Sequence, residues 1–145
     1  MANLIERVEN TQKTIDYWQG QTFEWGTADC GQMVGWHLEQ AGISTPLKDA
    51  RAYTTEIGAK RAMKALGADF MEDFIDRLGF ERIAPASAIV GDVIGLPGGT
   101  EDDQWTALGV HLGTDRILAF AAAEGDVARV HSGSASVATI AWRVS

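Results

Sequence analysis

The sequence is poor in three features that often determine what a small protein can do. It has a single cysteine, Cys30, so neither an internal disulfide nor a multi-cysteine metal site is expected. No run of apolar residues approaches ~18, the length that a membrane-spanning helix needs. Basic residues are scarce, 12 against 20 acidic ones, and the net charge of -8 repels phosphate backbones and anionic membranes. We therefore expect no nucleic-acid partner and no membrane insertion.

The length and composition are those of one folded domain. The chain has 145 residues, 46% of them hydrophobic, and five tryptophans, which is enough to bury a core. We expect one domain over residues 1–145, without a metal or a cofactor. The first ten residues carry acids where a secretory signal carries bases, so we expect a protein made in the cytoplasm without a signal peptide. If it is phage-encoded, it would leave the cell in the virion tail.

Apolar side chains at helical spacing occupy the first 80 residues. A first helix is expected to end at Gly20. Its expected inner face consists of Leu4, Val8, Thr11, Ile15 and Trp18. Three further helices are expected over residues 30–41, 55–66 and 69–78.

After Pro85 the pattern changes to short apolar or alternating runs, which indicate β-strands. Turn residues separate these runs at 97–99, 113–115, 124–126 and 132–134. The short link at 113–115 favours a hairpin. Helices over about residues 1–80 and strands over about 85–145 predict an α+β fold, in which the helices pack on an antiparallel β-meander of about five strands.

Cys30 stands where a helix is expected to begin. Asp29 is a favourable N-cap residue, and Gln32 follows three residues later, as in a capping box. A thiol attacks only as the thiolate, and the free amides and dipole of a helix start favour negative charge. We therefore expect a lowered pKa for Cys30, and room for a substrate backbone beside the small residues at 26, 28 and 31. The competing interpretation is a buried cysteine that fills space.

Several motifs around Cys30 resemble those of the NlpC-type, papain-like cell-wall peptidases. Trp-Gly at 25–26, Asp-Cys-Gly at 29–31, Gly-Ile at 42–43 and Pro46 resemble the catalytic helix and the residues around it. Val-Gly-Asp-Val-Ile at 90–94 resembles the Gly-Asp strand entry of that family, and residues 108–113 resemble its histidine-bearing strand. The resemblance implies a papain-like, NlpC-type fold with Cys30 at the nucleophile position.

A second resemblance covers nearly the whole chain. Residues 23–30, 91–93, 107–110 and 141–143 are similar to the recurring parts of a small domain family of undefined function. That family occurs in bacteriophage tail and prophage gene clusters, so the resemblance implies other tail or baseplate proteins as partners, with peptidoglycan as a second candidate.

The NlpC-type resemblance also implies that both catalytic partners of Cys30 are missing. The position of the histidine aligns with Ala107, and the third polar position, which orients the histidine, aligns with Ala119. Nucleophilic cleavage of an amide needs a base beside the thiol and a proton donor for the leaving group. The two positions are therefore expected to be degenerate.

Three histidines could replace the missing base. His111 lies four residues beyond Ala107 on the same expected strand, about 13 Å away, and is the first candidate. His37 follows Cys30 by seven residues, about 10 Å along a helix. His131 falls in a later strand, at a distance from Cys30 that the sequence does not determine.

These observations favour a bacteriophage or prophage tail-tip (hub or baseplate) protein of NlpC-like fold that is structural or catalytically degenerate. Two alternatives stay open. One is an active tail-associated cysteine endopeptidase or amidase that cleaves peptidoglycan peptides through Cys30. The other is an intracellular thiol hydrolase or transferase that acts on a small amide. A tail protein is assembled inside the cell, so the expected lack of a signal peptide fits both tail functions.

Overall fold

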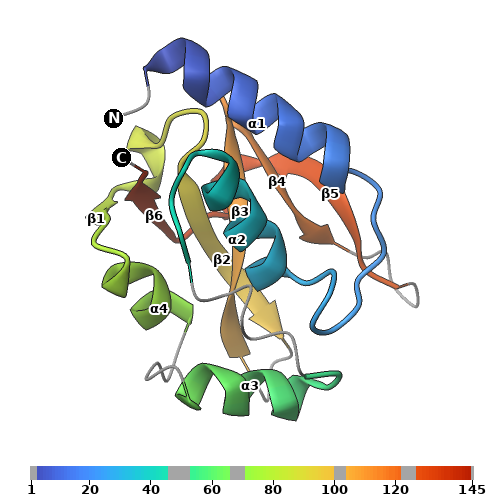
Figure 1. The fold of residues 1–145 in the computed structure, drawn as a ribbon. Helices are drawn as coiled ribbons and strands as arrows, with labels where there is room; N and C mark the ends of the chain where they lie inside the picture. The colour runs from blue at the N-terminus through green and yellow to red at the C-terminus, as the bar shows by residue number, and fades with distance from the viewer. Residues whose placement is uncertain (1–2, 46–52, 66–70, 100–103, 122–126, 145) are drawn as a thin grey trace.

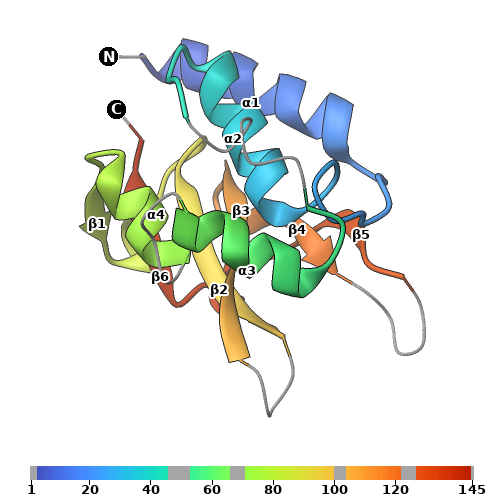
Figure 2. The same cartoon turned by 60° about the horizontal axis from the view of Figure 1, so that its bottom comes forward.

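Helices cover one face of an antiparallel sheet in the computed structural model, which describes residues 3–45, 53–65, 71–99, 104–121 and 127–144 (Figure 1). Its helices are α1 (Leu4–Trp18), α2 (Cys30–Gln40), α3 (Glu56–Ala65) and α4 (Met71–Arg77). Its strands are β1 (Glu81–Ile83), β2 (Val93–Gly99), β3 (Gln104–Gly113), β4 (Arg116–Ala121), β5 (Arg129–Ser134) and β6 (Ile140–Arg143). Short 3-10 turns occupy Pro85–Ser87 and Ala135–Val137. Helix α3 lies across the end of the molecule where α2 begins (Figures 1 and 2).

The predicted α+β architecture is confirmed, but the sheet is more than a meander. In the described residues its order is β1-β6-β2-β3-β4-β5, with every pair antiparallel. Strands β2 to β5 form the expected meander, with the β3–β4 hairpin at Gly113. Strand β6 then returns to lie between β1 and β2, which makes six strands instead of five. Both Ala141 and Trp142 of β6 are fully buried, and a strand with two neighbours provides that burial.

Two of the expected turns are wrong, because residues 97–99 and 132–134 continue β2 and β5. Pro97 is tolerated in β2 because β6 pairs with that strand only as far as Gly95. Beyond this point β2 has a single hydrogen-bonded neighbour, and a proline can occupy such an edge. Gly95 itself allows a close approach, since a Cβ there would lie 2.3 Å from the Ile140 side chain.

Three clusters of buried apolar side chains form the core. The first joins α2 and α4 to β2, β3 and β6, and it includes Cys30 and Trp142. The second joins α1 and α2 to β4 and β5 around Trp18 and Met33. The third lies on the other face of the sheet, because neighbours along a strand alternate between faces. It consists of Ile94, Ile117, Ala119 and Ala141.

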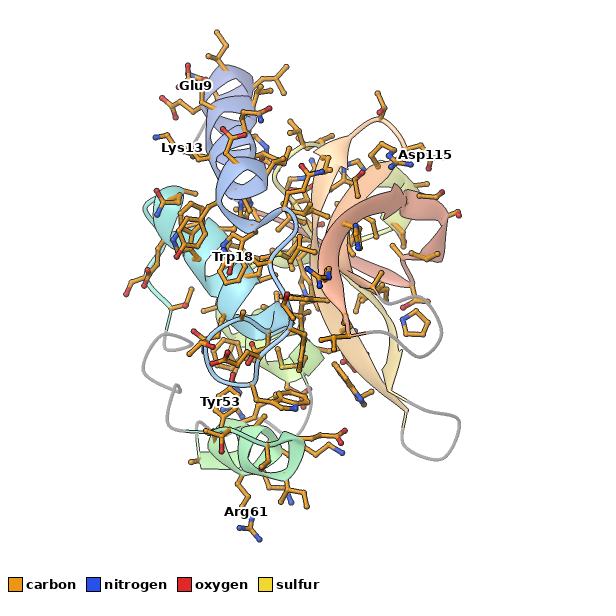
Figure 3. The ribbon with its side chains drawn as sticks, turned by 90° about the vertical axis from the view of Figure 1, so that its right-hand side faces the viewer. Glu9, Lys13, Trp18, Tyr53, Arg61 and Asp115 are labelled. Carbon is orange, nitrogen blue, oxygen red and sulfur yellow. The ribbon has the colours of Figure 1, made fainter. Side chains whose placement is uncertain are left out.

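The buried face of α1 differs from the expected one. Leu4 and Val8 are 63% and 49% exposed, whereas Thr11 and Trp18 of the expected face are buried. The buried side chains of α1 are Arg7, Thr11, Thr14 and Trp18. In Figure 3, Trp18 points toward the sheet, and Glu9 and Lys13 point away from it. The reason for the difference is Arg7, whose guanidinium is drawn inward by buried acceptors.

The two later helices are held to different degrees. Phe74 and Ile75 of α4 are buried in the first core cluster, as the spacing predicts. In contrast, no residue of α3 is buried, and Met63 only packs against that cluster from its edge. The expected ends of these helices at residues 66 and 69–70 lie outside the described residues.

Candidate functional site

Cys30 is the first residue of α2, and local hydrogen bonds hold it there. Asp29 has an extended backbone and caps the helix, since its Oδ1 accepts the Gln32 amide at 2.9 Å. Its Oδ2 accepts the Gly26 amide at 2.9 Å, which ties the preceding loop to the same carboxylate. Gly42, with φ 82°, ends the helix in the conformation that glycine favours. The position of the thiol is therefore determined by the backbone at both sides of residue 30.

The thiol is buried, and burial determines its acidity. Cys30 is only 8% exposed. Burial first, and the Asp29 carboxylate second, raise the pKa of Cys30 to about 12, although nearby backbone amides such as that of Leu108 offset part of the effect. The expectation of a lowered pKa is wrong, because desolvation outweighs the field of the helix start. The thiol is therefore protonated at neutral pH.

The small residues near Cys30 do not leave open space. Gly26, Ala28 and Gly31 are all buried, so the expected room for a substrate backbone is absent from this part of the described structure. Trp105 and Phe120 pack against the core cluster that contains Cys30.

Aromatic rings link the loop before α2 to β3 and β4. Phe23 contacts Trp25 at 4.7 Å and Phe120 at 5.5 Å between ring centroids, both edge to face. Trp25 reaches Trp105 at 6.5 Å. Edge-to-face pairs at these distances each add roughly 0.5–1.5 kcal/mol beyond the burial of their area. The rings thus stabilise the loop that leads into the helix start.

The two alanines lie in different places relative to Cys30. Ala107 packs against the cluster that contains Cys30, and the amide of the next residue, Leu108, acts on the thiol. Ala119 belongs to the third cluster, on the face of the sheet turned away from α2. The β4 residue that packs against the Cys30 cluster is Phe120. A side chain at position 119 would therefore point away from the thiol.

His111, the first candidate base, lies elsewhere. It is buried and pairs across the sheet with Ile117 of the third cluster. Its Nδ1 accepts the Gly113 amide at 3.0 Å, and burial lowers its pKa, so the ring is held neutral at the β3–β4 hairpin. In the described part of the chain no histidine ring is hydrogen-bonded to Cys30. The structure does not bring this candidate base together with the thiol.

The other two histidines are also placed away from a catalytic role. His37 Nε2 donates to the Gly91 carbonyl at 3.0 Å, so Nδ1 accepts from the Thr14 hydroxyl at 2.7 Å. Burial lowers the pKa of His37, and the ring is a neutral connector between α1, α2 and the entry of β2. His131 is exposed on β5 and pairs with Ala119.

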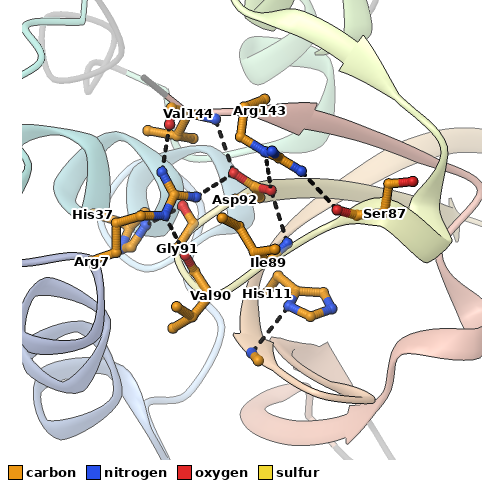
Figure 4. A network of polar contacts seen from close by, with 11 residues as sticks. Arg7, His37, Ser87, Ile89, Val90, Gly91, Asp92, His111, Arg143 and Val144 are labelled. Carbon is orange, nitrogen blue, oxygen red and sulfur yellow. Dashed lines mark hydrogen bonds and ion pairs between the residues drawn. The ribbon is translucent and has the colours of Figure 1, made fainter. Parts of the chain in front are cut away.

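A buried ionic network lies beside His37, at the Gly-Asp motif of residues 91–92 that resembles the strand entry of the NlpC-type peptidases (Figure 4). Asp92 is fully buried, and its carboxylate accepts from the guanidinium groups of Arg7 and Arg143. It also accepts the Val144 amide at 3.0 Å and the Ile89 amide at 2.9 Å. With four donors, the carboxylate is neutralised and saturated, which a buried charge requires.

Arg7 connects three distant segments through this network. Its Nε donates to the Val90 carbonyl at 2.8 Å and its Nη1 to the Val144 carbonyl at 2.5 Å, while the third nitrogen binds Asp92. Sequence reasoning missed Arg7, because an arginine on an amphipathic helix is normally counted as outward-facing. The glycine and aspartate at 91–92 therefore serve the architecture of the fold.

Tyr53 is a second residue that the sequence did not point to. It lies just before α3 (Figure 3), and its hydroxyl donates to Asp29 Oδ2 at 2.6 Å. The Gln32 side-chain amide donates to the same hydroxyl at 3.4 Å. Burial and the Asp29 carboxylate raise the pKa of Tyr53 well above its usual range, so the hydroxyl stays a donor. No local signal in the sequence indicates this contact, because Tyr53 and Asp29 are 24 residues apart in the sequence.

A comparison of the sequence with known families gives a match that covers almost the whole chain. The family described as "Domain of unknown function (DUF6950)" matches residues 6–144. The chain belongs to the DUF6950 family. No curated protein sequence matches this DUF6950 chain.

A solved structure resembles the DUF6950 chain in fold. It is described as the crystal structure of a protein similar to lipoprotein, of the NLP/P60 family, from Staphylococcus aureus subsp. aureus Mu50. The TM-score is 0.62 at 17% identity, and the match covers 99% of this chain and 43% of that one. The chain therefore spans less than half the length of this neighbour. At this identity the likeness concerns the fold, and it confirms the expected NlpC-type architecture.

The chemistry open to the DUF6950 site follows from these contacts. The site has a thiol at a capped helix start. However, no histidine in the described residues is positioned to take the proton of this thiol or to protonate an amine leaving group. The described residues contain no group of three His, Cys, Asp or Glu side chains placed to hold a metal ion. None of the described helices is long and apolar enough to cross a bilayer.

Proposed function

We propose that this chain is a catalytically degenerate NlpC/P60-like domain that serves as a structural component of a bacteriophage or prophage tail tip. The observation that carries the first half of the proposal is the state of Cys30. Its thiol is buried, its pKa is raised to about 12, and the candidate base His111 is bound to the Gly113 amide. A site in this state supports neither attack on an amide nor departure of the amine.

The tail assignment is supported by the sequence resemblance over residues 23–30, 91–93, 107–110 and 141–143. Partners would be neighbouring tail or baseplate proteins. In such a role the fold serves as a rigid module, and the buried Asp92 network supplies that rigidity. The positions of the former catalytic groups are then free to change, as Ala107 illustrates.

Cleavage can be tested directly on purified peptidoglycan. The chain is incubated with labelled sacculi near neutral pH, and released peptides are quantified by mass spectrometry. We expect release no greater than that of the Cys30→Ser variant. Turnover that disappears in Cys30→Ser would overturn the degenerate assignment and support the alternative, an active endopeptidase or amidase.

The tail assignment needs a separate experiment. An epitope-tagged chain is expressed in a lysogen that carries the gene, the prophage is induced, and particles are purified on a density gradient. We expect the tagged chain to co-sediment with tails at a fixed ratio to the other tail proteins. A chain that stays in the soluble fraction would contradict the assignment.

A further inference from the structure

The Tyr53 hydroxyl is bonded to the residue that caps the Cys30 helix. The acceptor, Asp29 Oδ2, also receives the Gly26 amide, so Tyr53 joins the group of donors that surrounds this cap. Asp29 is 3% exposed and Tyr53 is half-buried. Cys30 itself contributes to the rise in the pKa of Tyr53, which places the phenol within electrostatic range of the thiol. Tyr53 therefore reaches the Cys30 site from outside the core.

Tyr53 is coupled to α3 by local contacts. The Thr55 hydroxyl accepts the Gly58 amide at 3.0 Å and the Thr55 carbonyl accepts the Ala59 amide at 2.9 Å, which caps the first turn. A Cβ on Gly58 would lie 3.1 Å from the Cβ of Tyr53, so the tyrosine folds back tightly onto this turn. Residues 53–65 therefore behave as one unit.

This unit is held to the rest of the described structure by few contacts. No residue of α3 is buried, and Ile57 is 65% exposed. Met63 packs against the edge of the cluster that contains Cys30. Elements with little buried apolar surface open locally at much lower cost than core elements. Within the described residues, the hydrogen bond from Tyr53 to Asp29 and the packing of Met63 are the contacts that join this unit to the Cys30 site.

We propose that residues 53–65 form a cover over the Cys30 site, latched by the hydrogen bond from the Tyr53 hydroxyl to Asp29, and that the thiol becomes accessible when this latch opens. The cover would regulate access to the Cys30 site, and it rests on the proposed function for the identity of that site. In the closed form the cover keeps water away from the thiol. When the cover opens, both the Asp29 cap and the start of α2 gain solvent.

The test is the alkylation rate of Cys30 in the folded chain. Tyr53→Phe removes the latch and keeps the ring, and the rate with excess iodoacetamide is measured at about pH 8, where a solvated thiol begins to ionise. We expect alkylation at least about 10-fold faster than in the wild type, the size expected for loss of one hydrogen bond to a charged acceptor. Tyr17→Phe, on the exposed side of α1, is the matched control and should leave the rate unchanged.

Hydrogen exchange separates opening of the cover from general loosening. In Tyr53→Phe we expect faster exchange for amides of residues 56–65, with unchanged protection in β3 and the later turns of α2. An unchanged alkylation rate in a variant with native circular dichroism would overturn the cover. Equal loss of protection throughout the chain would also overturn it, since the faster alkylation would then come from global unfolding.

The cover and the proposed function fail in different ways. Peptide release from sacculi by Tyr53→Phe, lost again in the double variant with Cys30→Ser, would overturn the degenerate assignment and support the cover. Unchanged alkylation without peptide release would overturn the cover and support the degenerate assignment.

Discussion

Two opposing effects act on the sulfur of Cys30. The capped start of α2 and the amide of Leu108 favour the thiolate, whereas removal from water and the neighbouring Asp29 carboxylate disfavour it. Desolvation of a fully buried group changes a pKa by up to about 3–5 units, more than a helix end supplies. A cysteine at the start of a helix therefore has a lowered pKa only when its thiol is also exposed to solvent.

This balance predicts how alkylation of Cys30 depends on pH. At pH 7 the native chain should react about 1,000-fold more slowly than a free thiol, because its pKa is raised from 9.0 to about 12. The rate should rise about tenfold per pH unit between about pH 6 and 8. Stopped-flow or mass-spectrometric alkylation gives the profile, and a plateau near pH 8 would contradict the buried, protonated thiol.

Ala107 and Ala119 provide a matched pair of positions at which a histidine can be introduced. Ala107→His places an imidazole beside the Cys30 cluster, where its cationic form would lower the pKa of the thiol. We expect alkylation at neutral pH to be about 10-fold faster than in the wild type. Ala119→His puts the same group on the other face of the sheet and should have no such effect. Equal acceleration in both variants would show that distortion of the sheet, and not the imidazole, is responsible.

At the scale of elements, α1 is positioned by one buried cation. Arg7 binds the segment before β2 and the residue after β6, and Asp92 lies between them. A helix that exposes Leu4 and Val8 but buries an arginine is docked chiefly by polar contacts at its N-terminal half. Such contacts are directional, so they determine where α1 lies on the sheet.

Removal of the Arg7 guanidinium should strongly destabilise the fold. Arg7→Met leaves the carboxylate of Asp92 with one ion-pair partner fewer, and we expect the free energy of unfolding to fall by about 3–5 kcal/mol in urea titrations. The control is Lys60→Met, which breaks the exposed pair with Glu56, whose atoms are 3.7 Å apart. That change should cost about 0.5 kcal/mol or less. Similar losses in both variants would contradict the special role of Arg7.

For the whole molecule, the buried histidines predict the behaviour in acid. The folded-state pKa of His37 and of His111 lies below the ordinary 6.5, chiefly because both rings are buried. Below pH 6.5 the unfolded chain binds protons that the folded chain excludes. The stability contributed by the neutral rings is therefore complete above pH 6.5 and is lost as the pH falls toward the lowered values.

Thermal denaturation between about pH 4 and 8 measures this loss. His37→Gln keeps a donor for the Gly91 carbonyl but does not titrate, so its melting temperature should fall less steeply below pH 6.5 than that of the wild type. His131→Gln, at an exposed position, is the control and should follow the wild-type curve. Parallel curves for the wild type and His37→Gln would exclude His37 as a source of acid sensitivity.

Local patterns were sufficient for much of the fold. The start of α2 at Cys30, its Asp29 cap and the β3–β4 hairpin depend on neighbouring residues, and all three occur as the sequence indicates. The insertion of β6 between β1 and β2 depends on pairing between distant segments, such as Ile94 with Ala141, and leaves no local trace in the sequence. The burial of Arg7 and the raised pKa of Cys30 depend on partners from distant segments, so residue type and spacing mislead at both positions.

The bond from Arg7 to the Val144 carbonyl spans 137 residues of sequence. During synthesis, residue 7 leaves the ribosome well before its acceptors at residues 90, 92 and 144. The buried guanidinium of Arg7 therefore lacks its full set of partners until residue 144 has emerged. We expect α1 to dock late in folding and to stay exposed to chaperones until then.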